Sequence, residues 1–475
     1  MMSQDVQTII LAAGKSNRFN TGRSKLLEKI CGQEMILFPT KLLAFLHIDT
    51  TLVVGHKREE ITEIVTKHHG TSIRFAIQEE QLGTGHALLC SQPTWEKEHI
   101  LILNGDMPLI SQEIIKNLYD KHKETNAELS FISAHYPEPS AYGRVVKKEG
   151  RIKIIEAKDL TGDDTEHCCI NAGIYLIKKT FLMEYVHQIE SNNQAQEFYL
   201  TDLVELASQN NYRVEMIEAP FDSIRGINTL KELWAAEHIK RSEIIDYWMS
   251  KGVRFSKAHT IHIDLNVTIG SGTVVGQAVQ FIGTTTIGKN CIIEPFAILE
   301  NMVVKNDTII HAHTILKNSR IDESAIIGPF THIHDACHIG KNTTIGNFCE
   351  ITQSVIGEHT QAEHMVYIGN AHIGSHVFIG AGTFTSNFDG KKNQETTIKD
   401  HALLKGNNQL IAPVVVGEHV CTHAGSILKG NISANEMDID TDEKYSFVHQ
   451  KEGSTAQTNT PPIFSRVNPK KNLAP

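Results

Sequence analysis

The sequence predicts an α/β domain followed by a parallel β-helix. In the first half, short apolar runs alternate with segments of helical spacing, which is typical of an α/β domain with a mainly parallel sheet. In the second half, aliphatic residues recur at every sixth position, which indicates stacked hexapeptide repeats. Between the halves, apolar residues at near-helical spacing predict one long helix over residues 228–252.

The bulk composition limits the classes of protein to consider. A chain of 475 residues is too long for one hydrophobic core, and its 40% apolar and 21% charged residues are typical of globular proteins. The net charge of −10 argues against a nucleic-acid partner, which requires basic surface. The sequence has no run of about 18 consecutive apolar residues, so it does not predict a transmembrane helix. The N-terminus does not resemble a signal peptide, and the eight cysteines form no CxxC pair, so we expect a cytoplasmic protein.

Five apolar runs are the expected strands of the first half: residues 7–12, 51–54, 73–77, 99–103 and 128–134. Helices are expected between them, over residues 36–46 and 58–68. In sheets of this kind, ligands bind at the carboxyl ends of the strands. Gly14 follows the first of these strands and Asp106 follows the fourth, so both are expected at that edge.

The first strand ends in a stretch suited to phosphate binding. The apolar residues 9–13 are followed by Gly14, which has no side chain to keep a phosphate away. Backbone N–H groups in such a loop form an anion cradle, and Arg18 and Lys25 add two cations beside it. We expect a triphosphate site here.

Asp106 is a candidate magnesium ligand, because a hard divalent cation prefers carboxylate oxygen and shares its coordination shell with phosphates. The alternative is that Asp106 caps the helix expected from Ser111 or stabilises the turn before Pro108. The presence of Gly14 and Lys25 in the same sheet favours the metal role.

Residues 78–87 form a second candidate loop, with two glycines around Thr84. Gln78 offers both a donor and an acceptor, which is the pair that the edge of a uracil ring requires. The alternative is a simple loop-to-helix junction with Thr84 as the N-cap.

Further motifs follow in order along the first half: Tyr142-Gly143-Arg144, Ile155-Glu156, Ile170-Asn171-Ala172-Gly173, Thr201-Asp202-Leu203 and Gly226-Ile227-Asn228. Together with Leu11-Ala12-Ala13-Gly14, Lys25, residues 78–87 and Gly105-Asp106, this order resembles a bacterial enzyme family. It is the bifunctional N-acetylglucosamine-1-phosphate uridyltransferase/glucosamine-1-phosphate acetyltransferase family. The resemblance implies a Rossmann-like nucleotidyltransferase domain and a left-handed parallel β-helix.

The resemblance also implies roles for individual residues. Arg18 and Lys25 would be catalytic and hold the triphosphate, while Asp106 and Asn228 would bind Mg²⁺. The nucleotide would contact Leu11, Ala12, Ala13, Gly14, Gln78, Gly83 and Thr84. The amino sugar would contact Asn104, Gly105, Gly143, Glu156 and Asn171.

The implied reaction is a single in-line displacement. A phosphate oxygen of N-acetylglucosamine-1-phosphate, or of a close amino-sugar-1-phosphate, attacks the α-phosphorus of UTP, and pyrophosphate leaves. This nucleophile is already ionised at neutral pH, so the site must supply orientation and charge neutralisation rather than a general base. In the resembling enzymes the UDP-sugar product serves the cell envelope, in peptidoglycan and lipopolysaccharide synthesis.

Three positions of the first half depart from the family pattern. Ser16-Asn17 stand where the family has Gly-Thr, and Asn104 replaces a tyrosine. A Ser-x-Arg loop also occurs in cytidylyltransferases of the same fold, so a CTP-dependent enzyme remains an alternative.

The hexapeptide period appears as three series of residues that we expect to point inward. The series are Ile263, Ile269, Val275, Phe281, Ile287, Ile293, Leu299; then Ile315, Ile321, Ile327, Ile333, Ile339, Ile345, Ile351; then Ile398, Leu404, Leu410, Val416. Resemblance to hexapeptide acyltransferases implies a homotrimer formed through the β-helix. Residues 384–394 interrupt the repeat with a polar excursion long enough to reach a neighbouring subunit.

In the second half, the resemblance implies acetyl transfer from acetyl-CoA, with His364 as the base. Other matching positions are Tyr367, Ala381, Asn387 and Ala424. Much positive charge is lost, because His334 stands for a family arginine, and Thr352 and Asn393 stand for lysines that hold the sugar phosphate. Phe378 and Gly406 are further departures. The alternatives for the second half are therefore a trimeric scaffold without catalysis or an enzyme that acylates a different acceptor. Acetyl-CoA is expected as a cosubstrate only if the acetyltransferase activity is retained.

The expected domains are residues 1–227, a linker helix over 228–252, the β-helix over 253–436 and a tail over 437–475. The tail segment 454–475 is rich in Thr, Asn, Pro and Lys, and we expect it to be disordered. Three hypotheses follow for the whole chain: a UTP-dependent uridylyltransferase, the full bifunctional enzyme, or a scaffold or regulatory protein with degenerate sites.

Overall fold

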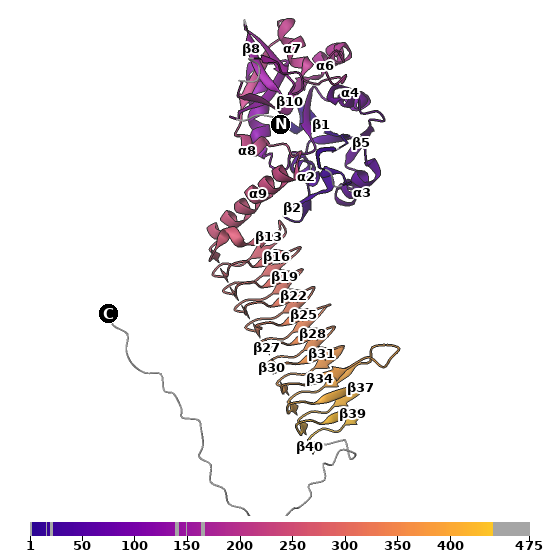
Figure 1. Ribbon diagram of the computed structural model, residues 1–475, viewed down its shortest axis with the longest axis vertical. Coiled ribbons are helices and arrows are strands. Elements are labelled where there is room, and N and C mark those ends of the chain that lie inside the picture. The colour runs from indigo at the N-terminus through magenta and orange to yellow at the C-terminus, as the bar shows by residue number, and fades with distance from the viewer. Residues whose placement is uncertain are drawn as a thin grey trace, which may run out of the picture.

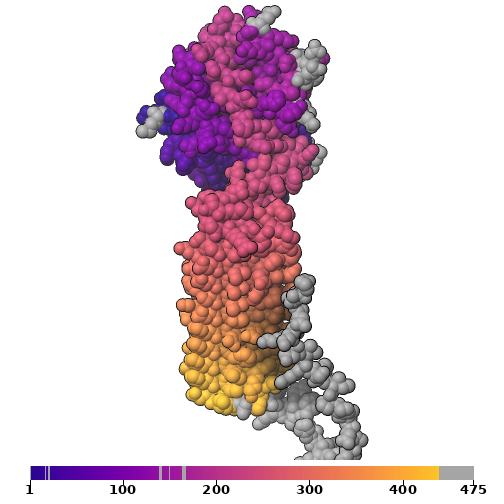
Figure 2. Space-filling model, turned by 90° about the vertical axis from the view of Figure 1, so that its left-hand side faces the viewer, coloured from indigo at the N-terminus to yellow at the C-terminus, as the bar shows by residue number. Residues whose placement is uncertain are grey.

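The computed structural model describes residues 2–15, 17–19, 22–137, 142–148, 150–162 and 167–439. A rounded N-terminal body stands on a long column of stacked coils (Figures 1 and 2). Ser16 and the tail segment 454–475 lie outside the described residues. Within the described ranges, no helix has both the length and the apolar character that crossing a membrane requires.

The N-terminal body is built on a twisted sheet in the order β11-β7-β10-β6-β1-β4-β5. Its main strands are β1 (Val6–Ala12), β4 (Asp49–Val54), β5 (Ile73–Ile77), β6 (His99–Asn104), β7 (Leu129–His135), β10 (Cys169–Lys178) and β11 (Val214–Glu218). The neighbouring strands are parallel except for β10, which runs antiparallel to β6 and β7. A hairpin of β8 (Arg144–Lys148) and β9 (Arg151–Ile155) joins β10. The five strands expected from the sequence are all present, and the antiparallel part is additional.

Helices cover the two faces of this sheet, so its strands are apolar on both sides, as is usual for parallel sheets. Ile10 packs in the core on one face, and its neighbour Ile9 packs in the core on the other. The helices are α2 (Leu37–Phe45), α3 (Arg58–His69), α4 (Thr84–Cys90), α5 (Gln112–Thr125), α6 (Lys179–Tyr185) and α7 (Asp202–Gln209). Smaller elements are α1 (Met2–Asp5), α8 (Phe221–Ile224) and the hairpin β2 (Lys29–Ile30) and β3 (Gln33–Glu34).

Two buried histidines, His99 on β6 and His122 on α5, contact each other within this body. His122 Nε2 lies 3.1 Å from His99 Nδ1, and His122 Nδ1 lies 2.7 Å from Ser130 Oγ. Burial, with His99 and the nearby Lys178 and Lys123 adding repulsion, lowers the pKa of His122 to about 3. His122 is therefore neutral in the folded chain at ordinary pH.

We expect this pair to make the fold sensitive to acid. An unfolded histidine titrates near 6.5, whereas folded His122 titrates at about 3. The unfolded chain thus binds the proton first, so stability is full above about pH 6.5 and falls as the pH drops below it. His122→Gln should remove part of that fall. Thermal melts of both proteins at about pH 7.5 and about pH 5 test this, and an equal loss of melting temperature in the two proteins would contradict it.

The helix α9 (Leu230–Ser250) joins the body to the column. Its start is a capping box, in which Thr229 Oγ1 accepts from Glu232 N at 3.2 Å and Glu232 Oε2 accepts from Asn228 N at 2.7 Å. The partly buried Ile244 packs against a core cluster of each part. Trp234, by contrast, is 66% exposed and stacks on His238, so it is not part of a core cluster.

The column is a parallel β-helix of very short strands, from β12 (Arg254–Phe255) to β40 (Met437–Ile439). Every pairing between successive coils is parallel, and up to the projecting loop a residue pairs with one 17 or 18 positions further on. Across that loop the separation is 25 residues, as between Phe378 and Leu403. Phe281 pairs with Leu299, 18 residues later, and Leu299 pairs with Leu316, 17 residues later. The inward residues form one continuous apolar stack along the column.

The 17-residue coils correct one of the predicted inward positions. The step from Leu316 to Ile321 spans five residues rather than six, so the inward residue before Ile321 is Leu316 and not Ile315. Leu316 is fully buried, whereas Ile315 is only partly buried on the outer side of β22 (Ile315–Lys317). The other residues of the three predicted series are all buried in this stack.

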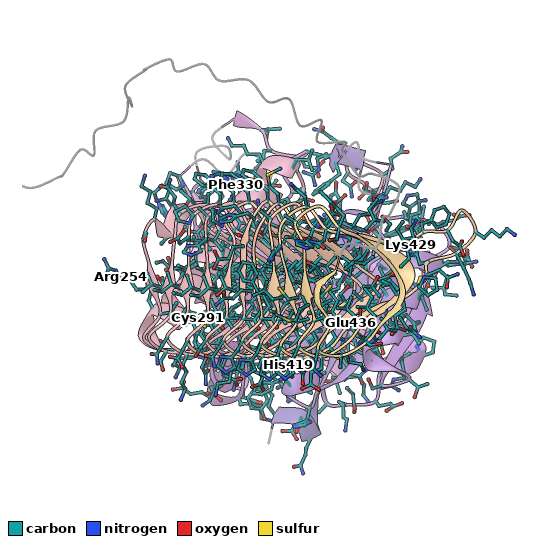
Figure 3. All side chains as sticks on the ribbon, turned by 90° about the horizontal axis from the view of Figure 1, so that it is seen from below. Arg254, Cys291, Phe330, His419, Lys429 and Glu436 are labelled. Atoms are coloured by element: carbon teal, nitrogen blue, oxygen red, sulfur yellow. The ribbon has the colours of Figure 1, made fainter. Side chains whose placement is uncertain are left out.

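Two ladders of aromatic rings run along separate corners of the column, where each coil has a residue with positive φ. Ring centroids are 4.8–5.3 Å apart, close to the usual spacing of paired strands. Figure 3, which looks along the column, shows Phe330 and His419 on opposite sides of the coil. One ladder is Phe296, His313, Phe330 and Phe348; the other is His359, His376, His401 and His419.

The predicted polar excursion is a loop that projects from the column between β34 (Phe384–Ser386) and β35 (Thr396–Ile398) (Figure 1). Asp389 organises its turn, because its carboxylate accepts from Lys391 N at 2.8 Å and Lys392 N at 2.9 Å. Phe388 in this loop is exposed. Whether the loop reaches another subunit stays a prediction.

Candidate functional site

A cavity of about 670 Å³ opens in the N-terminal body at the carboxyl ends of β1 and β6. All the site residues predicted for the first half line it, except Gly105. Gly105 lies behind the wall, where its N–H donates to Leu11 O at 2.9 Å. A Cβ at Gly105 would lie 2.9 Å from Ile36 Cδ1, so a glycine here allows close packing.

Two cations, a carboxylate and an amide from three distant segments meet in the cavity. Lys25 Nζ donates to Asn228 Oδ1 at 2.7 Å and forms an ion pair with Asp106. Arg18 Nη2 donates to the same Asn228 Oδ1 at 2.8 Å. Lys25 belongs to a short 3₁₀ turn that Ser24 caps, while the capping box of α9 fixes Asn228. Two cations are thus held beside Gly14, where a chain of phosphates would need them.

The oxygens of Asp106 and Asn228 fit a magnesium ion by their chemistry. They are a carboxylate and an amide oxygen, both hard ligands of the kind that Mg²⁺ takes together with water and phosphate. Asp106 does not cap α5, because Ser111 is itself the N-cap and its Oγ accepts from Ile114 N. The capping alternative for Asp106 is therefore wrong.

The Gly14 loop leaves room for a ligand. Among the described residues, apart from its chain neighbours, no heavy atom lies within 4 Å of the place where a Cβ of Gly14 would stand, so this backbone borders open space there. Lys15 also lines the cavity beside it. The loop can thus approach an anion without a side chain in between.

The second loop presents Gln78 to the cavity. Gln78 is buried, and its Nε2 donates to Gly83 O at 3.1 Å and lies 3.0 Å from His86 Nδ1. Gly83 has a φ of 112°, and a Cβ there would lie 2.5 Å from Phe198 O, so no other residue fits without a backbone shift. Gly83 occupies the N-cap position of α4 and Thr84 is its first residue, which contradicts the N-cap alternative for Thr84.

A third wall of the cavity holds Glu156 and Asn171. Thr201 Oγ1 donates to Glu156 Oε1 at 3.1 Å, and burial raises the pKa of Glu156. Asn171 Nδ2 donates to the Tyr175 hydroxyl at 2.6 Å, which fixes the amide. These groups offer hydrogen bonds suited to the hydroxyl and amide groups of a sugar.

Several cavity residues were not among the predicted site residues: Lys15, Gln81, Tyr142, Tyr175, Glu197, Thr201 and Gly226. Tyr175 lies on β10, an antiparallel strand that the sequence analysis did not predict. Tyr142, Thr201 and Gly226 belong to the quoted motifs, so the motif boundaries were the available signal for them.

The residues predicted for the second half are spread along the lower column. His364 ends β30 (Gln361–His364) and is exposed, with its Nε2 3.8 Å from Glu363 Oε2. Tyr367 begins β31 (Tyr367–Gly369), and Tyr367 and Asn387 both lie next to Gly369. Ala381 and Ala424 are exposed. The cavity of the N-terminal body contains none of these five residues.

Two family models match the chain. The model described as a MobA-like NTP transferase domain matches residues 8–158. The model described as bacterial transferase hexapeptide (six repeats) matches residues 318–353.

Relatives match nearly the whole chain. The Bifunctional protein GlmU of Exiguobacterium sibiricum is 35% identical over 437 residues, which cover 91% of this chain and 96% of the relative. That of Alkaliphilus metalliredigens is 33% identical over 439 residues, which cover 91% and 95%. Among solved structures, the inositol-1-phosphate CTP transferase from T. maritima aligns with half of this chain and 96% of its own, at 17% identity and a TM-score of 0.39.

Proposed function

The chain belongs to the bifunctional GlmU family and is a nucleotidyltransferase, and on that premise we propose that it makes UDP-N-acetylglucosamine from UTP and N-acetylglucosamine-1-phosphate. A close amino-sugar-1-phosphate is the variant of this proposal. The nucleotidyltransferase part would comprise residues 1–227, followed by a linker helix over 228–252, the β-helix over 253–436 and a tail. We infer that the enzyme acts in the cytoplasm and that its product is a precursor of the cell envelope.

One observation carries the proposal. Lys25, Asp106 and Asn228 meet at one end of the cavity that also holds Gln78 and Glu156. The cluster of charged groups suits a triphosphate, while the hydrogen-bonding side chains Gln78, Glu156 and Asn171 suit a base and a sugar. A single cavity of about 670 Å³ is large enough for both substrates together.

Each wall would have a distinct task. Arg18 and Lys25 would neutralise the phosphates and hold the α-phosphorus in line with the attacking oxygen. The Gln78 oxygen would accept from the N3–H of uracil, because its nitrogen is engaged by Gly83 O. Glu156 and Asn171 would fix the amino sugar. No residue needs to remove a proton, because the attacking phosphate is already ionised.

Magnesium would be held by Asp106 and Asn228. When bound, it would neutralise charge on the phosphates and help to align them. In the structure, Lys25 pairs with both Asp106 and Asn228. Because a bound magnesium ion would take its place on these two residues, we expect the Lys25 side chain to turn toward the phosphates when the substrates and the ion are present.

A nucleotide panel tests the proposal. The full chain is incubated with Mg²⁺, each nucleoside triphosphate and several sugar-1-phosphates, and pyrophosphate release is measured. We expect UTP with N-acetylglucosamine-1-phosphate to be the best pair. Release with CTP alone would replace the proposal by a cytidylyltransferase, and no release with any triphosphate would overturn it.

A second activity is favoured by the hexapeptide match and by the bifunctional relatives. In this reading a homotrimer formed through the β-helix would transfer acetyl from acetyl-CoA to glucosamine-1-phosphate, with His364 as the base. Free thiol release from acetyl-CoA measures it directly. No release would leave the β-helix as a scaffold.

A further inference from the structure

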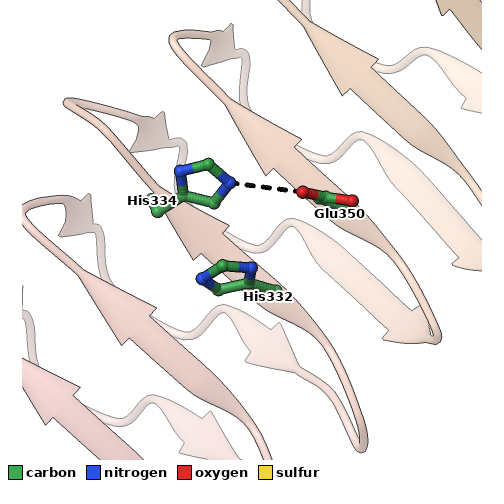
Figure 4. A group of neighbouring side chains, drawn as sticks. All are labelled: His332, His334 and Glu350. Atoms are coloured by element: carbon green, nitrogen blue, oxygen red, sulfur yellow. Dashed lines mark hydrogen bonds and ion pairs between the residues drawn. The ribbon is translucent and has the colours of Figure 1, made fainter.

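Two histidines and a glutamate converge on the outer surface of the β-helix, remote in sequence from every residue of the cavity (Figure 4). His332 and His334 lie on β25 (His332–His334), and Ile333 between them points inward. Glu350 begins β28 (Glu350–Thr352) of the next coil, directly opposite His332. The hydrogen-bonded coils therefore hold the three side chains on one face.

The three side chains are close enough to share one ion. One ligand atom from each lies within 4.8 Å of the others. His334 Nε2 is 3.4 Å from Glu350 Oε1, and the two imidazole rings stack with centroids 4.2 Å apart. Within the described part of the chain, the ring nitrogens of His332 have no hydrogen-bond partner.

The contacts of His334 point to a cation between it and Glu350. His334 Nδ1 is 2.8 Å from Asp335 Oδ2, so the Nδ1 proton is donated to that carboxylate. In the neutral tautomer with its proton on Nδ1, the lone pair of His334 Nε2 faces the carboxylate of Glu350, whose Oε1 is 3.4 Å away. Two acceptors that face each other repel unless a proton or a metal ion lies between them. A carboxylate behind a histidine is also the usual support of a metal-bound imidazole.

We propose that His332, His334 and Glu350 bind a zinc ion. Two imidazole nitrogens and one carboxylate oxygen are a ligand set that zinc takes in sites with an open fourth position. Tetrahedral ligands at about 2.0–2.1 Å from zinc lie about 3.3 Å apart, so the present spread must contract by a modest side-chain rotation. Glu350, whose side chain is 52% exposed, is free to make it.

The fourth position would be open to water or to an anionic oxygen of a ligand. Thr352 Oγ1 lies 3.4 Å from His334 Nδ1, and Glu350 pairs with Tyr367 on the following coil. The zinc would thus place positive charge on the face of the column that carries Tyr367. This site does not depend on the nucleotidyl reaction proposed above.

Zinc binding by the full-length chain tests the proposal. The protein is freed of metal with a chelator, dialysed and titrated with Zn²⁺ against a coloured chelator, with excess Mg²⁺ present to occupy oxygen-rich sites. We expect about one equivalent of tightly held zinc. The double variant His332→Gln/His334→Gln should lose it, and Asp335→Asn should weaken it about 10–100-fold. Cobalt should give the absorption bands of a tetrahedral ion in the wild type only.

The chain supplies a matched control. His401, Glu418 and His419 also lie close together on the column, but all three are exposed. The double variant His401→Gln/His419→Gln removes the same number of histidines, and we expect it to keep the zinc. Loss of zinc in this variant instead, retention in His332→Gln/His334→Gln, or no tight zinc in the wild type would each overturn the proposal. Circular dichroism melts of both double variants establish that the column remains folded.

Discussion

Replacing Lys25 with methionine is expected to lower kcat/KM for pyrophosphate release by about 10²–10³-fold, the usual cost of removing one fixed group that stabilises charge in a transition state. Lys25 is the cation that contacts both Asp106 and Asn228, and its side chain is largely buried. Methionine keeps the length and apolar stem of lysine, so the loss should appear mainly in the rate rather than in folding. Steady-state kinetics with UTP and N-acetylglucosamine-1-phosphate measure it.

Lys29 provides the control for this experiment. It lies on β2, only four residues from Lys25, but its side chain is 62% exposed and pairs with Glu34 at the surface. Lys29→Met should change kcat/KM by no more than about twofold. An effect of equal size in the two variants would mean that Lys25 acts only through general charge, and an unchanged Lys25→Met enzyme would remove Lys25 from the site.

Leu316→Ala is expected to destabilise the β-helix by about 2–5 kcal/mol, whereas Ile315→Ala should cost less than about 1 kcal/mol. Leu316 is fully buried in the inner stack between Leu299 and Ile333, and its truncation would leave a cavity that rigid coils cannot close. Ile315 stands on the outer side of the same strand. Urea unfolding followed by circular dichroism measures the two changes. A larger loss from Ile315→Ala would contradict the observed register.

The sequence was sufficient where the signal is local. The apolar run before Gly14 and the run before Asp106 are strands β1 and β6, because a strand buried on both faces is a continuous apolar segment. The resemblance to the family motifs predicted that Lys25 and Asn228 share one site, and they do lie in one cavity although they are 203 residues apart in the sequence. Local patterns and motifs thus predicted most of the parallel sheet and of the cavity wall.

The sequence was insufficient where a strand's partner lies elsewhere in the chain. β8 contains Arg144 and two lysines, so it does not look like a strand until β9 and β10 pair with it. Tyr175 lies on β10, a largely apolar strand that reaches the cavity through antiparallel pairing with the sequence-distant β6. The inward position is Leu316 rather than Ile315 because the next turn has five residues, and a search for a strict six-residue period does not detect such a turn. His332 and Glu350 look unrelated in the sequence because they are neighbours only across a coil.

The nearly constant coil length has an evolutionary consequence. Before the projecting loop, residues 17 or 18 positions apart are neighbours on the same face, as His332 and Glu350 are, so chain separation there translates directly into position in space. Epistasis between outward-facing positions should therefore peak at that separation. A new surface function can arise by two or three point substitutions in adjacent coils while the inner aliphatic stack stays unchanged, so selection on the surface and selection on folding can proceed almost independently.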